Sequence, residues 1–98
     1  MKKNVIVSPA AKTDIARLKA YIKEELKMPE TAANYITELK NVVKKLAYYA
    51  DSIGINKYVQ DMFGMNARHI TFKKMAIVFF IENDIIYIIR VMPSSLIY

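Results

Sequence analysis

The sequence predicts an α+β fold with the order β-α-α-β-β-β, in which a helix hairpin packs on a mostly antiparallel four-stranded sheet. Two observations predict this fold. Apolar residues recur at helical spacing through the first half of the chain, and after Met65 the period changes to two. The chain has 98 residues, which suits one domain, and neither a linker nor an internal repeat divides it. We therefore expect residues 1–98 to form a single domain.

The first half predicts a short strand followed by two helices. Lys3 to Val7 is rich in β-branched residues, which indicates a buried strand. Ser8 and Pro9 then begin a helix, because serine caps free backbone N–H groups and proline needs no donor at the first helical position. This helix ends before Pro29, which opens a longer helix that is expected to stop at Gly54. The two helices therefore form a hairpin with a short loop.

The second half predicts three strands joined by tight turns. Residues 54–64 show no clear period, and we expect a loop there with one helical turn. The strands are Ala67–Phe72, Met75–Ile81 and Ile85–Met92. Lys73-Lys74 and Asn83-Asp84 connect them, and the second pair has good turn residues.

Two-residue turns also predict a register. Arg68 would pair with Phe79, and Ile77 would pair with Ile70 on one side and Arg90 on the other. Arg68 and Arg90 would then lie on one face, about two residues apart. Both faces of the sheet are apolar, and one hairpin can cover only one of them. The other face is either a docking surface for a partner or is covered by the C-terminal tail and residues 54–64.

Composition limits the chemistry. The chain has no cysteine and one histidine, which excludes a disulfide framework, a thiol nucleophile and a histidine-rich metal site. We expect neither a metal nor a small-molecule cofactor. The net charge of +6 on a chain that is 54% hydrophobic indicates a folded basic surface with an acidic partner. Residues 1–50 carry 10 basic and 5 acidic side chains, whereas residues 51–98 carry 5 and 4, so the excess lies on the helices.

No segment of the sequence resembles a targeting signal or a membrane span. The apolar run Val5–Val7 is too short for a signal-peptide core, which needs about 7 residues or more. The apolar stretch Met75–Met92 is interrupted by charged residues and is rich in strand-forming ones. We therefore expect a cytoplasmic protein that has no membrane contact.

An ordered set of motifs resembles the RelE/ParE toxin superfamily over nearly the whole chain. Val5–Ile15 (VIVSPAAKTDI) is similar to its opening, and Tyr21–Ala33 to its helix junction around a proline. Arg68 followed by Ile70 is similar to its "R-x-l" strand, and Ala76–Val91 to its closing strands. The resemblance implies the toxin of a type II toxin–antitoxin pair, inhibited by a cognate antitoxin.

The C-terminus departs from the family pattern. Relatives of this shape continue with arginines and an aspartate, whereas this chain ends Met92–Tyr98 without them. Relatives that cut messenger RNA need clustered basic residues, but relatives that poison DNA gyrase do not. The resemblance therefore favours a ParE-like, gyrase-directed toxin. The alternatives are a RelE-like, ribosome-dependent mRNA endoribonuclease and an inactive homologue that only binds an antitoxin, so the sequence leaves open whether the protein is an enzyme.

Candidate site residues follow from these alternatives. In a nuclease, Arg68, Lys74 and Arg90 would stabilise developing charge without a metal. His69, Lys73 and Tyr98 would bind the target or nucleic acid. The structural interpretation is that both arginines form ion pairs, with Glu82, Asp61 or a C-terminal carboxylate, that the lysines form a solvated turn, and that the histidine is a packed strand residue.

Lysines also form ridges along both predicted helices. A ridge of this kind would bind phosphate without sequence preference, or it is simply a solvated helix face. Its members are Lys12, Lys19, Lys23 and Lys27 on the first helix and Lys40, Lys44 and Lys45 on the second.

Overall fold

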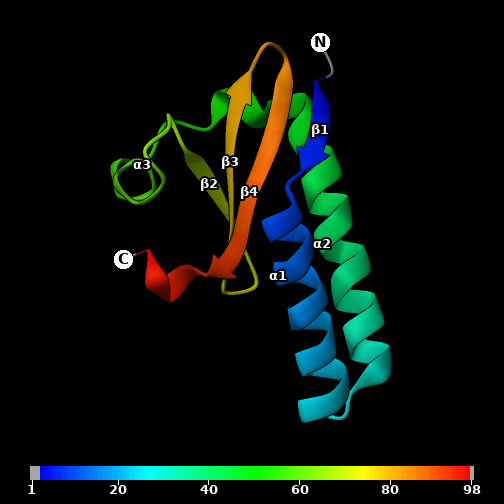
Figure 1. The fold of residues 1–98 in the computed structure, drawn as a ribbon. Helices are drawn as coiled ribbons and strands as arrows, with labels where there is room; N and C mark the ends of the chain where they lie inside the picture. Colours follow the sequence, from blue (N-terminus) through cyan, green and yellow to red (C-terminus); the bar gives the residue numbers. More distant parts are fainter. Residues whose placement is uncertain (1–2, 98) are drawn as a thin grey trace.

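The computed structural model describes residues 3–97, and they form a four-stranded sheet with the order β1-β4-β3-β2. β1 (Asn4–Val7) pairs in parallel with β4 (Ile85–Pro93). β3 (Met75–Glu82) lies between β4 and β2 (Arg68–Phe72), antiparallel to both. The two long helices lie side by side along one side of the sheet (Figure 1). The predicted fold class is confirmed, with one short helix added.

The helix hairpin starts as predicted. α1 (Pro9–Ala20) has Ser8 as its N-cap, whose Oγ accepts a hydrogen bond from the Ala11 N–H at 3.0 Å. The same hydroxyl donates to the Ile89 carbonyl at 2.8 Å, which ties the helix start to β4. α1 continues as a π-helical segment (Tyr21–Glu25), and α2 (Pro29–Tyr49) then runs back. None of the helices within residues 3–97 combines the length and hydropathy needed to cross a bilayer.

The prediction that the second helix extends to Gly54 is wrong. The helix tightens into a 3-10 turn (Ala50–Ser52) directly after Tyr49. Ala50 and Ile53 have apolar side chains at helical spacing, so the pattern alone could not mark the end. The Arg68 guanidinium binds the carbonyls of these two residues instead, and the chain leaves the helix four residues early.

The main core lies between the hairpin and one face of the sheet. Leu39 and Leu46 of α2 are fully buried against Phe79 of β3 and Ile88 of β4. Ala11 of α1 joins them, which places both helices on this core. Burying side chains of this size contributes about 1.5–3 kcal/mol each, so this layer supplies most of the driving force for folding.

α3 and the C-terminal tail cover part of the opposite face of the sheet. α3 (Lys57–Phe63) begins at Asn56, whose side chain accepts from the Val59 N–H at 3.1 Å, and ends at Gly64 with φ +71°. Val59 and Ile97 of the C-terminal tail pack on Ala76 and Val78. Of the two alternatives left open for this face, covering by the tail and residues 54–64 is therefore the one observed around Ala76 and Val78. The single helical turn predicted within residues 54–64 is a longer helix in the structure, because two helical turns are too short to reveal a period, although the Asn cap and Gly stop were present.

The predicted register is right between β2 and β3, and between β3 and β4 it is right from the turn to Phe79 but wrong beyond it, where Ile77 was predicted to pair with Arg90. Arg68 pairs with Phe79 and Ile70 with Ile77. On the other side Ile77 pairs with Val91, whereas Val78 pairs with Arg90 and Phe79 with Ile88. An irregularity between Val78 and Phe79 therefore leaves one extra residue, Ile89, in β4. A bulge of this kind inserts a residue that no pattern of alternating side chains predicts.

The β2–β3 turn offers a test of local strain. Lys73 and Lys74 have φ of +44° and +68°, a conformation that glycine adopts without cost. We expect Lys74→Gly to raise the free energy of unfolding by about 0.5–1 kcal/mol, measured by urea titration. Lys74→Ala removes the same side chain but keeps the strain, so it should leave stability unchanged. Equal effects of both variants would show that the side chain, and not φ, determines stability here.

Candidate functional site

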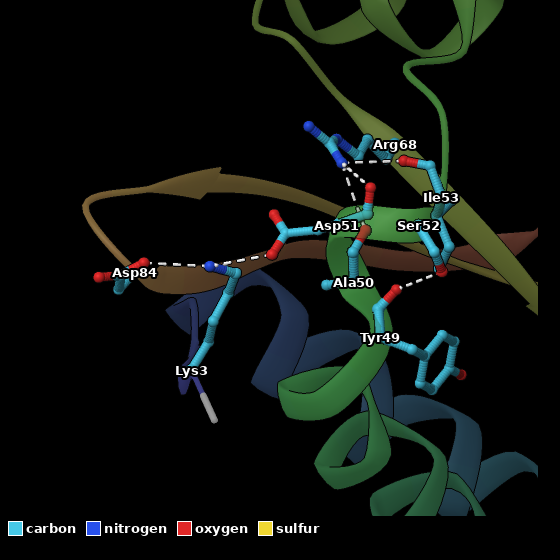
Figure 2. A network of polar contacts seen from close by, with 8 residues as sticks. All are labelled: Lys3, Tyr49, Ala50, Asp51, Ser52, Ile53, Arg68 and Asp84. Carbon is cyan, nitrogen blue, oxygen red and sulfur yellow. Dashed lines mark hydrogen bonds and ion pairs between the residues drawn. The ribbon is translucent and has the colours of Figure 1, made fainter. Parts of the chain in front are cut away.

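Arg68, the first residue of β2, forms hydrogen bonds with the segment that follows α2 (Figure 2). Its Nη1 donates to the carbonyls of Ile53 at 2.9 Å, Ala50 at 3.3 Å and Asp51 at 3.4 Å. Carbonyls at a helix C-terminus lack partners within the helix, so a guanidinium is well suited to bind them. The structure therefore gives Arg68 carbonyl partners in place of the carboxylates that were predicted.

This contact predicts a structural role for Arg68. We expect Arg68→Ala to lower the free energy of unfolding by about 2 kcal/mol, because the carbonyls of Asp51 and Ile53 lose their guanidinium donor and the Ala50 carbonyl keeps only the Ile53 N–H. Arg68→Lys keeps the charge but loses the planar fork, and should recover no more than about half of that loss. Urea denaturation of the three proteins checks this. A fully stable Arg68→Ala variant would contradict the structural role.

Arg90 forms an ion pair through two hydrogen bonds, and its partner is Asp14 of α1. Arg90 Nε lies 2.7 Å from Asp14 Oδ2, and its Nη2 lies 2.9 Å from Oδ1. Asp14 Oδ2 also accepts the Val91 N–H at 3.0 Å. The hydrogen bonds to Asp14 raise the pKa of Arg90 above its usual value. The pair joins α1 to the part of β4 that extends beyond β1. Arg90 therefore pairs with Asp14 and not with Glu82 or Asp61, the predicted partners.

The two arginines therefore do not converge. Arg68 binds the end of α2, whereas Arg90 binds α1. The bulge moves Arg90 into register with Val78 and His69, away from the row of Arg68 and Phe79. The predicted shared face is wrong for this reason, and the geometry offers no clamp in which both guanidiniums hold one phosphate.

The lysines of the β2–β3 turn lie in different surroundings. Lys73 forms an ion pair with Glu38 of α2, and its Nζ lies 5.7 Å from the ring centre of Tyr35 and 5.5 Å from that of Phe72. Lys74 is exposed, and its backbone carbonyl accepts both the N–H and the hydroxyl of Ser94. Lys73 is thus held against the helix layer, whereas the Lys74 side chain is presented to solvent.

His69 lies half-buried on β2, and burial lowers its pKa. The folded state therefore favours the neutral ring, and the unfolded state binds more protons as the pH falls through about 6.5. We expect the wild type to lose more stability than His69→Gln between about pH 7.5 and about pH 5.5. Urea midpoints at both pH values measure this, and an equal loss in both proteins would contradict it. Tyr98, the remaining predicted residue, lies outside the described residues.

No metal centre is built from these side chains. Within residues 3–97, no group of three or more His, Asp or Glu side chains is placed to hold an ion. The predicted residues are distributed over β2, the β2–β3 turn and β4.

A groove with a volume of about 550 Å³ lies between α1, α2 and β1. Val5 and Val7 of β1 line it together with Leu39 of α2, and apolar residues of α1 complete its floor. All four charged residues of its lining are lysines. The full lining is Val5, Val7, Lys12, Ile15, Ala16, Lys19, Ile36, Leu39, Lys40, Val43 and Lys44. We call this feature the lysine groove.

The lysine groove continues towards the end of α2. A second hollow of about 490 Å³ shares Val5 and Lys44 with it and reaches Tyr48. Lys3 lines this end, and its Nζ lies 3.1 Å from both Asp51 Oδ2 and Asp84 Oδ1 (Figure 2). Hydrogen bonds to these carboxylates raise the pKa of Lys3, so its amine stays protonated, and their negative charges offset its positive charge. The unpaired positive charge of the groove is thus concentrated on the walls made by α1 and α2.

Sequence reasoning found the lysines but missed the groove. Lysines at helical spacing were visible on both helices, yet the apolar floor depends on how β1, α1 and α2 meet. Lys12, Lys19, Lys40 and Lys44 line the groove, whereas the other ridge members do not. Asp14 was also missed as a functional or structural residue, although it belongs to the opening motif.

Comparison with known proteins identifies the family. A family model described as "ParE toxin of type II toxin-antitoxin system, parDE" matches residues 5–98. The chain belongs to the ParE toxin family. The predicted RelE/ParE resemblance is thereby confirmed, and so is the prediction of a type II toxin.

A solved structure has the same ParE fold. The chain is similar to one described as "Chromosomal ParDE TA system from P. aeruginosa", with a TM-score of 0.78 and 18% identity. The match covers 94% of this chain and 96% of that chain. No curated protein matches this sequence. The ParE family match extends to residue 98, so the unusual C-terminus does not remove the chain from the family.

Proposed function

We propose that this ParE toxin inhibits growth by binding DNA gyrase, and that its antitoxin neutralises it by docking in the lysine groove. The family match over residues 5–98 is the main support for gyrase as the target. The placement of the arginines supports it, because Arg68 and Arg90 stabilise separate parts of the fold. An inhibitor that acts by binding requires no convergent catalytic cluster.

The chemistry of the lysine groove supports the second part. An apolar floor favours the apolar stripe of an amphipathic helix, and lysines on both walls favour carboxylates that flank such a stripe. The lining of α2 from Ile36 to Lys44 corresponds to about 12 Å of helix, so it accommodates two to three turns of a partner helix. An acidic antitoxin segment fits this description, and a phosphate backbone would leave the apolar floor unused.

The target is tested with purified components. DNA supercoiling by gyrase should stop when the toxin is added and resume when the cognate antitoxin follows. In cells, induced expression should cause a DNA-damage response while messages remain intact. Ribosome-dependent cuts in messenger RNA with gyrase unaffected would contradict the proposal and favour the RelE-like nuclease. Normal growth under confirmed expression would instead indicate an inactive homologue that only binds antitoxin.

A further inference from the structure

A further concave site, separate from the lysine groove, lies at the edge of the sheet beside residues 80–82, where β3 extends beyond β2. β3 extends beyond its last pair with β2, Arg68 with Phe79, so within residues 3–97 no strand covers the side of residues 80–82 that faces β2. The connection from α3 to β2 passes beside this uncovered edge. Together they border an open pocket of about 410 Å³, lined by Gly64, Met65, Asn66, Phe80, Ile81 and Glu82. We call it the edge pocket.

One wall of the edge pocket is aromatic. The Phe80 ring stacks on Tyr87 of β4, with centroids 4.8 Å apart and an interplanar angle of 14°. The two residues are a cross-strand pair in the register, so Tyr87 covers the Phe80 ring on the β4 side. Phe80 itself lines the edge pocket together with residues 64–66, whereas Tyr87 does not. A ring held in this way presents a flat, electron-rich surface.

The charge of the edge pocket is opposite to that of the lysine groove. Its single charged lining residue is Glu82, which is exposed at the end of β3. Met65, which is 38% exposed, adds a polarisable thioether to the lining. An aromatic face next to a carboxylate attracts a cation and repels phosphate. Nucleic acid is therefore a poor occupant, even though the protein as a whole is basic.

We propose that the edge pocket binds an arginine side chain presented by a protein partner, with the guanidinium stacked on Phe80 and hydrogen-bonded to Glu82. A guanidinium is planar, stacks on aromatic faces and binds carboxylates with two parallel hydrogen bonds. Its long apolar stem fits beside Met65. At about 410 Å³ the pocket is near the small end of the range of about 300–1,000 Å³ for ligand sites, so it suits one side chain and not a helix.

The edge pocket gives the toxin a docking site for a basic protein surface that is separate from the lysine groove. The lysine groove selects an acidic segment between the helices, whereas this pocket selects a cation at the β2 side of the sheet. One molecule thus carries two sites of opposite preference. The second does not depend on gyrase as the target or on the antitoxin as the occupant of the groove.

The probe is N-acetyl-arginine amide, titrated into the isotopically labelled full chain and followed by NMR. We expect saturable shifts concentrated at residues 64–66 and 80–82. The neutral isostere N-acetyl-citrulline amide should bind at least about fivefold more weakly, because it lacks the charge that Glu82 and the Phe80 ring recognise. Shifts that are equal for both probes, or spread over all acidic residues, would overturn the proposal.

Variants separate the pocket from general charge attraction. Glu82→Gln should weaken arginine-amide binding roughly three- to tenfold, as expected for the loss of a charge-assisted hydrogen bond that is partly exposed to solvent. Glu30→Gln changes the net charge equally at the start of α2 and should leave the titration unchanged. Both variants alter exposed side chains, so folding is preserved in both. Equal binding by Glu82→Gln and the wild type would overturn the proposal.

Discussion

Asp14→Ala is expected to lower the free energy of unfolding by about 2–3 kcal/mol, a loss at least as large as that expected for Arg68→Ala. The Asp14 side chain is only 10% exposed and accepts two hydrogen bonds from Arg90 and one from the Val91 N–H. Removing it leaves a backbone donor of β4 without an acceptor. It also breaks the only ion pair that joins α1 to β4 within residues 3–97.

The partner substitution should cost less. The Arg90 side chain is 45% exposed, so in Arg90→Gln water replaces part of the hydrogen bonding that Asp14 loses. Asp14 also keeps the hydrogen bond that it accepts from the Val91 N–H. We expect Arg90→Gln to lower the free energy of unfolding by about 1 kcal/mol. The double-mutant cycle of Asp14→Ala and Arg90→Gln should give a measurable coupling energy. Glu25→Gln, at an exposed position of the hairpin, serves as the control and should be neutral. Urea unfolding of all variants gives the result. An Asp14→Ala variant as stable as Glu25→Gln would contradict the account of α1 docking.

Reversing two lysines of the lysine groove should weaken antitoxin binding roughly 100-fold. Lys40→Glu/Lys44→Glu replaces favourable pairs with repulsion at two positions, and about 1.4 kcal/mol at each gives this factor. The two side chains are exposed and four residues apart on α2, so one like-charged pair replaces another and the helix itself is little affected. Calorimetric titration with the antitoxin measures the change.

The control has the same net charge. Arg17→Glu/Lys45→Glu reverses two exposed cations on the same helices, and neither residue lines the groove. It should retain affinity within a few-fold, because general attraction between exposed charges is screened beyond about 8 Å at physiological salt. If both double variants lose affinity equally, binding depends on net charge alone and the groove is not the docking site.

The elements could be predicted because their signals are local. Ser8-Pro9 and Pro29 mark helix starts, and Asn83-Asp84 marks a tight turn whose φ values are +51° and +63° in the structure. Each of these depends on neighbouring residues and on backbone sterics. The same is true of the pairing between β2 and β3, which the two-residue turn determines.

The errors came from contacts between distant residues. Arg68 binds carbonyls 15 to 18 positions away and ends α2 early, and Asp14 binds Arg90 across 76 positions. The extra residue at Ile89 changes which side chains share a face. None of these changes the apolar pattern, so the pattern could not reveal them. The candidate site depended on them, and for this reason the fold was predicted better than the site.

Thiol protection tests the central claim, that antitoxin docks in the lysine groove, most directly. The natural chain has no cysteine, so a single introduced thiol is the only one that reacts with a maleimide. Ala16→Cys places it in the groove lining, and Asn34→Cys places it at an exposed position of α2 outside that lining. We predict that antitoxin slows labelling at position 16 by more than about tenfold and leaves position 34 unchanged. Unchanged labelling at position 16 in a saturated complex would contradict the account.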